Sequence, residues 1–181
     1  MVPRPKRKQR RTKKTILIVG EGPTEKAFLQ HIKHLYVTRD MDIVVKVECG
    51  SGGSPQSVVE KAVRLKSSMS YDKCFVLVDS DVAFEPDREL KKRMKKKPRI
   101  EMLNATPCIE GLMLAILKHP KFSQTKTSSD DCKRMFGKYV PEDKKTDRRS
   151  YEGIFSKEIL EARKNDVREL NEILKLIQEI E

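Results

Sequence analysis

The chain has 181 residues, which is enough for one domain with a substantial core, and its formal net charge is +12. Hydrophobic residues make up only 37% of it, and no stretch approaches the roughly eighteen consecutive apolar residues of a membrane span, so an integral membrane protein is excluded. The four cysteines never form a CxxC pair, which argues against a zinc cluster or a disulfide framework and favours reduced thiols in a cytoplasmic protein.

Residues 1–14 form a strongly basic segment. They contain eight Lys and Arg residues and no acid, and so supply +8 of the net +12. Such a segment is typical either of an arm that binds a phosphate backbone or of a disordered, solubilising tail, and both interpretations stay open. The residues predicted to contact nucleic acid here are Arg7, Arg10, Arg11, Lys13 and Lys14.

The first half of the chain alternates between apolar runs and helical patterns. Residues 15–20 form a continuous apolar run that ends in glycine, as a buried parallel strand does. A helical pattern begins at Pro23, and a second strand follows at 42–47. A flexible Gly/Ser loop over 49–54 leads into a helix from Pro55, and residues 74–78 form the clearest strand.

The second half begins with a basic helix over 87–97, whose predicted nucleic-acid contacts are Arg88, Lys92, Lys95 and Lys96; a solvated charged face is the alternative. The pattern then predicts a strand at 100–103, an apolar helix at 109–117, a polar loop at 118–129 and a short helix at 131–136. Residues 156–180 carry apolar side chains on one face and predict a single surface helix that packs on the core.

This order predicts an α/β fold with an open, mainly parallel sheet, helices on both faces and a C-terminal helical extension. We expect three parts: a basic, disordered arm at 1–14, the α/β domain at 15–122, and a helical extension at 123–181 that packs on the core.

Two of the predicted strands end in acidic residues. The first leads into Glu21, and the third into Asp79-Ser80-Asp81. Ligands of open parallel sheets bind at the carboxyl ends of the strands, so we expect Glu21, Asp79 and Asp81 to form one acidic site. Carboxylate oxygens are the ligands that Mg²⁺ and Mn²⁺ prefer. The alternative is that these acids only cap helices and form turns, and it is strongest for Glu25, a first-turn acid.

The segment Glu21-Gly-Pro-Thr-Glu25, followed by Asp79-Ser-Asp81, resembles the motifs of Toprim domains, which occur in topoisomerases, bacterial primases and some nucleases. More closely, the chain resembles the small RloB-like proteins found beside restriction and abortive-infection genes. Their downstream Asn-Pro-Cys-Phe-Glu-like motif reads Asn104-Ala-Thr-Pro-Cys-Ile-Glu110 here. The resemblance spans about residues 14–119. It departs from the family after Glu110, where a Trp-rich run is replaced and the chain has no Trp.

The resemblance implies roles for five residues. Glu21 would be a metal ligand or general acid/base, Asp79 and Asp81 would bind the metal, and Glu25 and Glu110 would complete a second metal position. All five are therefore predicted to be catalytic and metal-binding, with one or two Mg²⁺ or Mn²⁺ ions. The implied function is a metal-dependent nuclease acting on DNA or RNA in antiphage defence. An ATPase partner encoded nearby and homo-oligomerisation both stay open.

Two other functions remain as alternatives. The chain could be a non-catalytic basic subunit that binds nucleic acid or recruits a partner, or a domain for metal-dependent phosphotransfer on a small nucleotide. The three histidines are weaker candidates for metal binding or catalysis than the acids. His31 and His34 are predicted at the surface, and His119, close after Glu110, is a possible catalytic residue.

Overall fold

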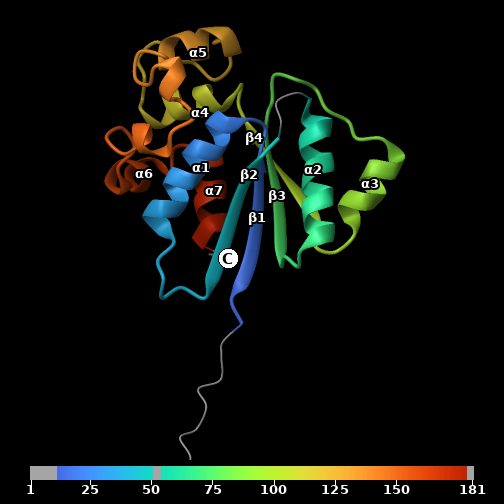
Figure 1. Cartoon of the computed structure of the whole chain (residues 1–181). Coiled ribbons are helices and arrows are strands. Elements are labelled where there is room, and N and C mark those ends of the chain that lie inside the picture. The colour runs from blue at the N-terminus through green and yellow to red at the C-terminus, as the bar shows by residue number, and fades with distance from the viewer. Residues whose placement is uncertain (1–11, 51–53, 179–181) are drawn as a thin grey trace, which may run out of the picture.

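The computed structural model of the protein describes residues 12–50 and 54–178. At its centre lies a sheet of four parallel strands in the order β2-β1-β3-β4 (Figure 1). The strands are β1 (Lys14–Gly20), β2 (Ile43–Cys49), β3 (Lys73–Asp79) and β4 (Ile100–Ala105). Gly20 of β1 pairs with Leu77 of β3, so β3 extends two residues further at the carboxyl edge. The predicted open, parallel α/β sheet is confirmed.

Helices cover both faces of the sheet, as predicted. One face carries α2 (Pro55–Ser68) and α3 (Arg88–Lys95). The other carries α1 (Pro23–Tyr36), α4 (Ile109–Ile116) and the C-terminal elements, as Figure 1 shows. The C-terminal elements are α5 (Ser129–Phe136), the 3₁₀ turns η1 (Glu142–Lys144) and η2 (Arg148–Tyr151), α6 (Lys157–Arg163) and α7 (Arg168–Gln178).

The strand order explains which face each connecting helix covers. The chain moves across the sheet towards one edge from β1 to β2. It then moves towards the other edge from β2 to β3 and on to β4. Crossover connections of a single hand place helices on opposite faces when the direction reverses. Thus α1 lies on one face, and α2 and α3 lie on the other.

The apolar run of β1 is buried on both sides because successive side chains point to opposite faces. Ile16 and Ile18 join the cluster under α1 and α4, whereas Leu17 and Val19 join the cluster under α2. The C-terminal extension has no separate core among the described residues, since Phe136, Tyr151 and other side chains of it belong to the first of these clusters.

The prediction of one helix over 156–180 is wrong. The chain forms two helices, α6 and α7, separated by a turn at 164–167. In this turn the backbone N–H groups of Asp166 and Val167 both donate to the carbonyl of Arg163, and Val167 is buried. The guanidinium of Arg163 donates to the carbonyls of Ala115 and Ile116 in α4, which holds the turn against that helix. The apolar periodicity continues through the turn, so it did not reveal the break.

The expected surface position of His31 is also wrong, whereas His34 is exposed as predicted. The His31 side chain is 1% exposed and its Nε2 lies 2.7 Å from the carbonyl oxygen of Phe155. The segment that covers it comes 124 residues later in the chain, so local sequence could not show its burial. No helix in the described part of the chain is long and apolar enough to cross a membrane.

Candidate functional site

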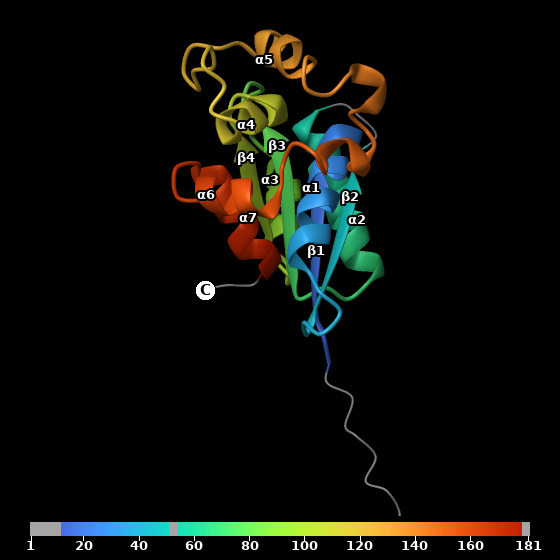
Figure 2. The ribbon, with the colours of Figure 1, turned by 90° about the vertical axis from the view of Figure 1, so that its left-hand side faces the viewer.

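The predicted carboxylates lie at the carboxyl edge of the sheet, where the chain direction reverses between β1 and β3. This point is the usual ligand site of an open parallel sheet. A cleft of about 340 Å³ opens here, and α5 lies beyond the strand ends above it (Figure 2). Its lining residues are Glu21, Gly22, Thr24, Glu25, Asp79, Glu110, Lys133 and Glu142.

Four of the five predicted acidic residues line this cleft, and backbone groups orient three of them. The carboxylate of Glu21 accepts a hydrogen bond from the N–H of Asp79 at 3.3 Å. Asp79 accepts the N–H of Ile109 at the start of α4, at 3.0 Å. Glu25 accepts the N–H of Gly22 at 2.7 Å, so it does cap α1 as the alternative interpretation held.

Close packing explains the glycine that precedes Glu21. A Cβ atom on Gly20 would lie 2.6 Å from the Cβ of Glu25, closer than such atoms approach. The absence of a side chain at Gly20 lets the first turn of α1 fold back onto the end of β1. This close approach places Glu25, which is only 6% exposed, beside Glu21 in the cleft.

The cleft concentrates negative charge. Burial raises the pKa of Asp79 to about 8, and the charges of Glu25, Glu21, Asp81 and Glu110 add to this effect. Burial also raises the pKa of Glu25 above its ordinary value, against the lowering effect of its backbone hydrogen bonds. Carboxylates this close disfavour one another's ionised form unless a cation lies among them.

A buried cation of the protein, Lys145, lies behind the cleft. The Lys145 side chain is 2% exposed, and its ammonium lies 3.3 Å from Glu110 and 2.6 Å from Glu142. Burial lowers the pKa of Lys145, but the hydrogen bond to Glu142 and the charge of Glu110 outweigh burial, and the pKa is raised. Glu110 is therefore held by an ion pair inside the protein rather than left free in the cleft.

Asp81 stands apart from the other four acids. β3 ends at Asp79, so the alternation of side chains does not carry Asp81 into the cleft. Its side chain is exposed and accepts a hydrogen bond from the hydroxyl of Ser129, the first residue of α5. It remains near enough for its charge to raise the pKa of Asp79.

The donor atoms fit a hard divalent cation in kind, since they are carboxylate oxygens at one edge of the sheet. A cation would also offset the mutual repulsion around Asp79. Their present arrangement is looser than a ligand cage: among the described residues, no three His, Cys, Asp or Glu side chains are grouped closely enough to hold a metal ion. Glu21 and Asp79, joined by a hydrogen bond, are the best placed to act together.

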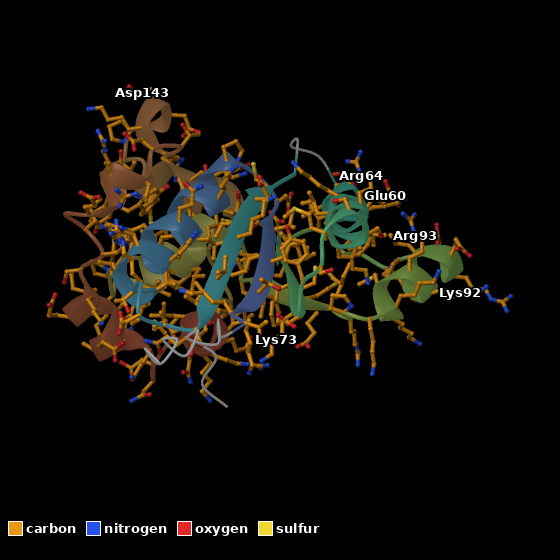
Figure 3. The ribbon with its side chains drawn as sticks, turned by 60° about the horizontal axis from the view of Figure 1, so that its bottom comes forward. Glu60, Arg64, Lys73, Lys92, Arg93 and Asp143 are labelled. Carbon is orange, nitrogen blue, oxygen red and sulfur yellow. The ribbon has the colours of Figure 1, made fainter. Side chains whose placement is uncertain are left out.

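The predicted nucleic-acid residues that the structure describes lie away from the cleft. Arg7, Arg10 and Arg11 fall outside the described residues, and Lys13 donates to the carbonyls of Arg39 and Met41. α3 packs outside α2, on the face of the sheet that contributes no helix to the cleft. In Figure 3, Lys92 and Arg93 extend from α3 towards solvent, and Arg64 extends from the neighbouring α2. The predicted contact residues on α3 and at its C-cap (Arg88, Lys92, Lys95 and Lys96) are exposed.

Sequence reasoning missed two cations of the site. Lys133 on α5 lines the mouth of the cleft and is exposed, and Lys145 lies buried behind Glu110. Both belong to the C-terminal extension, where no motif marked them. Only the docking of α5 and η1 over α4 brings them to the strand ends.

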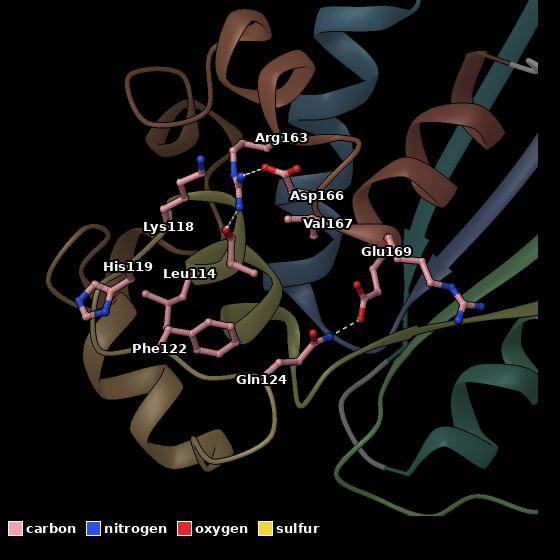
Figure 4. A pocket seen from close by; sticks show the side chains of 11 residues that line it. Leu114, Lys118, His119, Phe122, Gln124, Arg163, Asp166, Val167 and Glu169 are labelled. Atoms are coloured by element: carbon pink, nitrogen blue, oxygen red, sulfur yellow. Dashed lines mark hydrogen bonds and ion pairs between the residues drawn. The ribbon is translucent and has the colours of Figure 1, made fainter.

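A second cleft, of about 570 Å³, lies at the opposite end of α4 (Figure 4). His119, Phe122 and Lys118 line one side of it, and the turn between α6 and α7 forms the other. Hydrogen bonds of Arg163 to Asp166 and of Gln124 to Glu169 brace its walls. None of the predicted acidic residues reaches it, so His119 is separated from the carboxylates by the length of α4.

Comparison with known families assigns the chain. A family model described as RloB-like protein matches residues 16–178. The match runs from β1 to the end of α7 and includes all five predicted acidic residues together with Lys133 and Lys145. Searches among curated proteins and solved structures give no match. Because one family model covers most of the sequence, from the first strand to the last helix, the chain belongs to the RloB-like family.

Proposed function

We propose that this protein is a Toprim-type, metal-dependent nuclease that hydrolyses phosphodiester bonds of DNA or RNA in antiphage defence. The observation that carries the proposal is the convergence of Glu21, Glu25, Asp79 and Glu110 in one cleft at the reversal point of a parallel sheet. A purely structural role does not account for the repulsion that this grouping imposes on Asp79.

In this proposal Glu21 and Asp79 hold the ion, and Asp81, which lies outside the cleft, contributes only its charge. A separate contact places each of the three. Glu21 contacts the backbone of Asp79, Asp79 contacts the first turn of α4, and Asp81 contacts Ser129. A bound Mg²⁺ or Mn²⁺ would polarise the scissile phosphate and lower the pKa of an attacking water. Glu25, whose pKa is raised by burial, lines the same cleft and is the candidate to exchange a proton there.

Lysine side chains supply the contact with the substrate in this proposal. Lys133 stands at the mouth of the cleft, where a phosphate beside the reacting one would pass. The basic residues of α3 and of the N-terminal segment add salt-dependent affinity that does not depend on base sequence. A partner ATPase and self-association belong to the same proposal as regulators of activity.

The test is incubation of the full chain with Mn²⁺ and, separately, with DNA, structured RNA and tRNA, alone and with the product of a neighbouring gene. We expect Asp79→Ala and Glu21→Ala to lower cleavage at least about a hundredfold while binding changes by less than about threefold. Glu101→Gln, which alters an exposed carboxylate on β4, is the matched control and should cleave normally. Substrates that all stay intact under these conditions contradict the proposal.

One observation favours a second candidate, a non-catalytic subunit that binds nucleic acid. Among the described residues no ready metal-ligand group is formed, and Glu110 is already paired with Lys145. A binding subunit would be unaffected by Asp79→Ala and would lose most of its affinity on removal of residues 1–14. The same cleavage and binding assays therefore separate the two candidates.

A further inference from the structure

Lys145 is a buried charged group beside the site that no motif predicted. Its ammonium lies between Glu110 and Glu142, and both of these residues line the acidic cleft. The Glu110 side chain is 7% exposed, whereas that of Glu142 is 86% exposed, so the contact with Glu110 is the inner one.

The surrounding structure holds this lysine in place. Lys145 follows η1, and its backbone carbonyl accepts a hydrogen bond from the hydroxyl of Tyr151 at 2.7 Å. Tyr151 is fully buried and packs edge-on against Phe28 of α1, with ring centroids 5.8 Å apart. The ammonium is therefore delivered to Glu110 by a segment anchored in the core, and it is not a flexible surface lysine that reaches the cleft by chance.

An ammonium on Glu110 competes with a metal ion for the same carboxylate. Two cations that share one carboxylate repel each other, most strongly where water is excluded. A site for two metal ions also needs a carboxylate free to contact the second ion. Glu110, the residue expected to complete a second metal position, is held by Lys145 instead.

We propose that the Lys145 ammonium takes the place of a second metal ion, so that the cleft binds a single divalent cation near Glu21 and Asp79. Lys145 is then a positioning residue: it keeps Glu110 neutralised and fixed, and limits the site to one ion. This inference rests on the metal site of the proposed function and specifies that one metal ion binds per chain.

The test is Mn²⁺ titration of the full chain by isothermal calorimetry, with free Mn²⁺ followed by electron paramagnetic resonance. We expect one ion per chain in the unmodified protein and a second, weaker ion in Lys145→Met, which keeps the length of the side chain and removes its charge. Lys144→Met, a change at the exposed neighbour, is the matched control and should bind one ion. Lys145→Arg keeps the cation and should also bind one.

Two results overturn the inference while leaving the proposed nuclease intact: two ions in the unmodified protein, or one ion in a folded Lys145→Met. Absence of any Mn²⁺ binding contradicts the metal site itself and therefore the proposed function.

Glu110→Gln gives a second test that does not depend on Lys145→Met being folded. If Glu110 pairs with Lys145 and not with the metal, this variant should bind one Mn²⁺ with affinity within about threefold of the original. A loss of about tenfold or more would show that Glu110 is a metal ligand and overturn the inference.

Discussion

The carboxylate of Glu21 accepts the backbone N–H of Asp79 at 3.3 Å, a contact between residues 58 positions apart that joins the ends of β1 and β3. This hydrogen bond links the acidic motif that begins at Glu21 to the one that begins at Asp79, at the point where the strand order of the sheet reverses. Because β3 extends beyond β1, the N–H of its last residue is presented to the first side chain after β1.

Replacement of Asp79 by Asn should stabilise the metal-free protein and abolish its stabilisation by Mn²⁺. Asn can still accept the N–H of Ile109, but it removes a negative charge that burial, and then the charges of Glu25 and Glu21, disfavour. In EDTA at pH 8 we expect Asp79→Asn to melt about 5 °C or more above the unmodified protein. Added Mn²⁺ should raise the melting temperature of the unmodified protein and leave that of the variant unchanged. A lower melting temperature of Asp79→Asn in EDTA would show that the charge is not costly.

Addition of a single methyl group at Gly20 should displace Glu25 and so disturb the acidic cleft. The new Cβ would lie 2.6 Å from the Cβ of Glu25, so α1 or the end of β1 must move. We expect Gly20→Ala to lower the free energy of unfolding by about 2 kcal/mol and to weaken Mn²⁺ binding. Gly153→Ala is the control, since no described atom lies within 4 Å of its added Cβ. Equal stability of the two variants in urea denaturation would contradict the tight contact.

Lys133 should act on substrate binding rather than on chemistry. It lies at the mouth of the cleft, and within the described part of the chain no ion pair or hydrogen bond joins it to the carboxylates there. In the proposed nuclease, Lys133→Ala should raise KM about threefold to tenfold, reduce its salt dependence and leave kcat nearly unchanged. Lys138→Ala, an exposed lysine just after α5 that does not line the cleft, should change neither constant. A selective fall in kcat would assign Lys133 a role in the chemical step.

His31 should make the fold sensitive to mild acid. Burial lowers its pKa below 6.5, helped by the charge of Arg148 and opposed by the hydrogen bond to the Phe155 carbonyl. A base whose pKa is lowered by folding contributes its full stability above the unfolded pKa, near 6.5, and loses it as pH falls through the folded pKa. The free energy of unfolding should therefore decrease as the pH is lowered below about 6.5.

The variant that tests this is His31→Gln, whose amide can still donate to the Phe155 carbonyl but does not titrate. Its free energy of unfolding, measured in urea between pH 5 and 7, should vary less with pH than that of the unmodified protein. His34→Gln, a change at an exposed histidine on the same helix, should retain the original dependence. Parallel curves for all three proteins would assign the acid sensitivity to other groups.

Local sequence determined the sheet and three acids of the site, Glu21, Glu25 and Asp79. The buried strands were recognisable because β1 and β3 pack on both faces and so consist of continuous apolar residues. Glu21 and Asp79 were recognisable as partners because parallel strands bring their carboxyl ends to one edge. The short motif also included Glu25, whose capping contact is made within three residues of the chain.

Only the tertiary structure decided which residues the C-terminal extension contacts. The break between α6 and α7 depends on Arg163 contacting the carbonyls of α4, and the burial of His31 depends on a carbonyl 124 residues away. Asp81 lies outside the cleft because β3 ends at Asp79, and Glu110 is paired because the segment after η1 brings Lys145 to it. Such contacts join segments distant in the chain, and hydrophobic periodicity reports only which face of a segment is buried. It does not report which other segment covers that face.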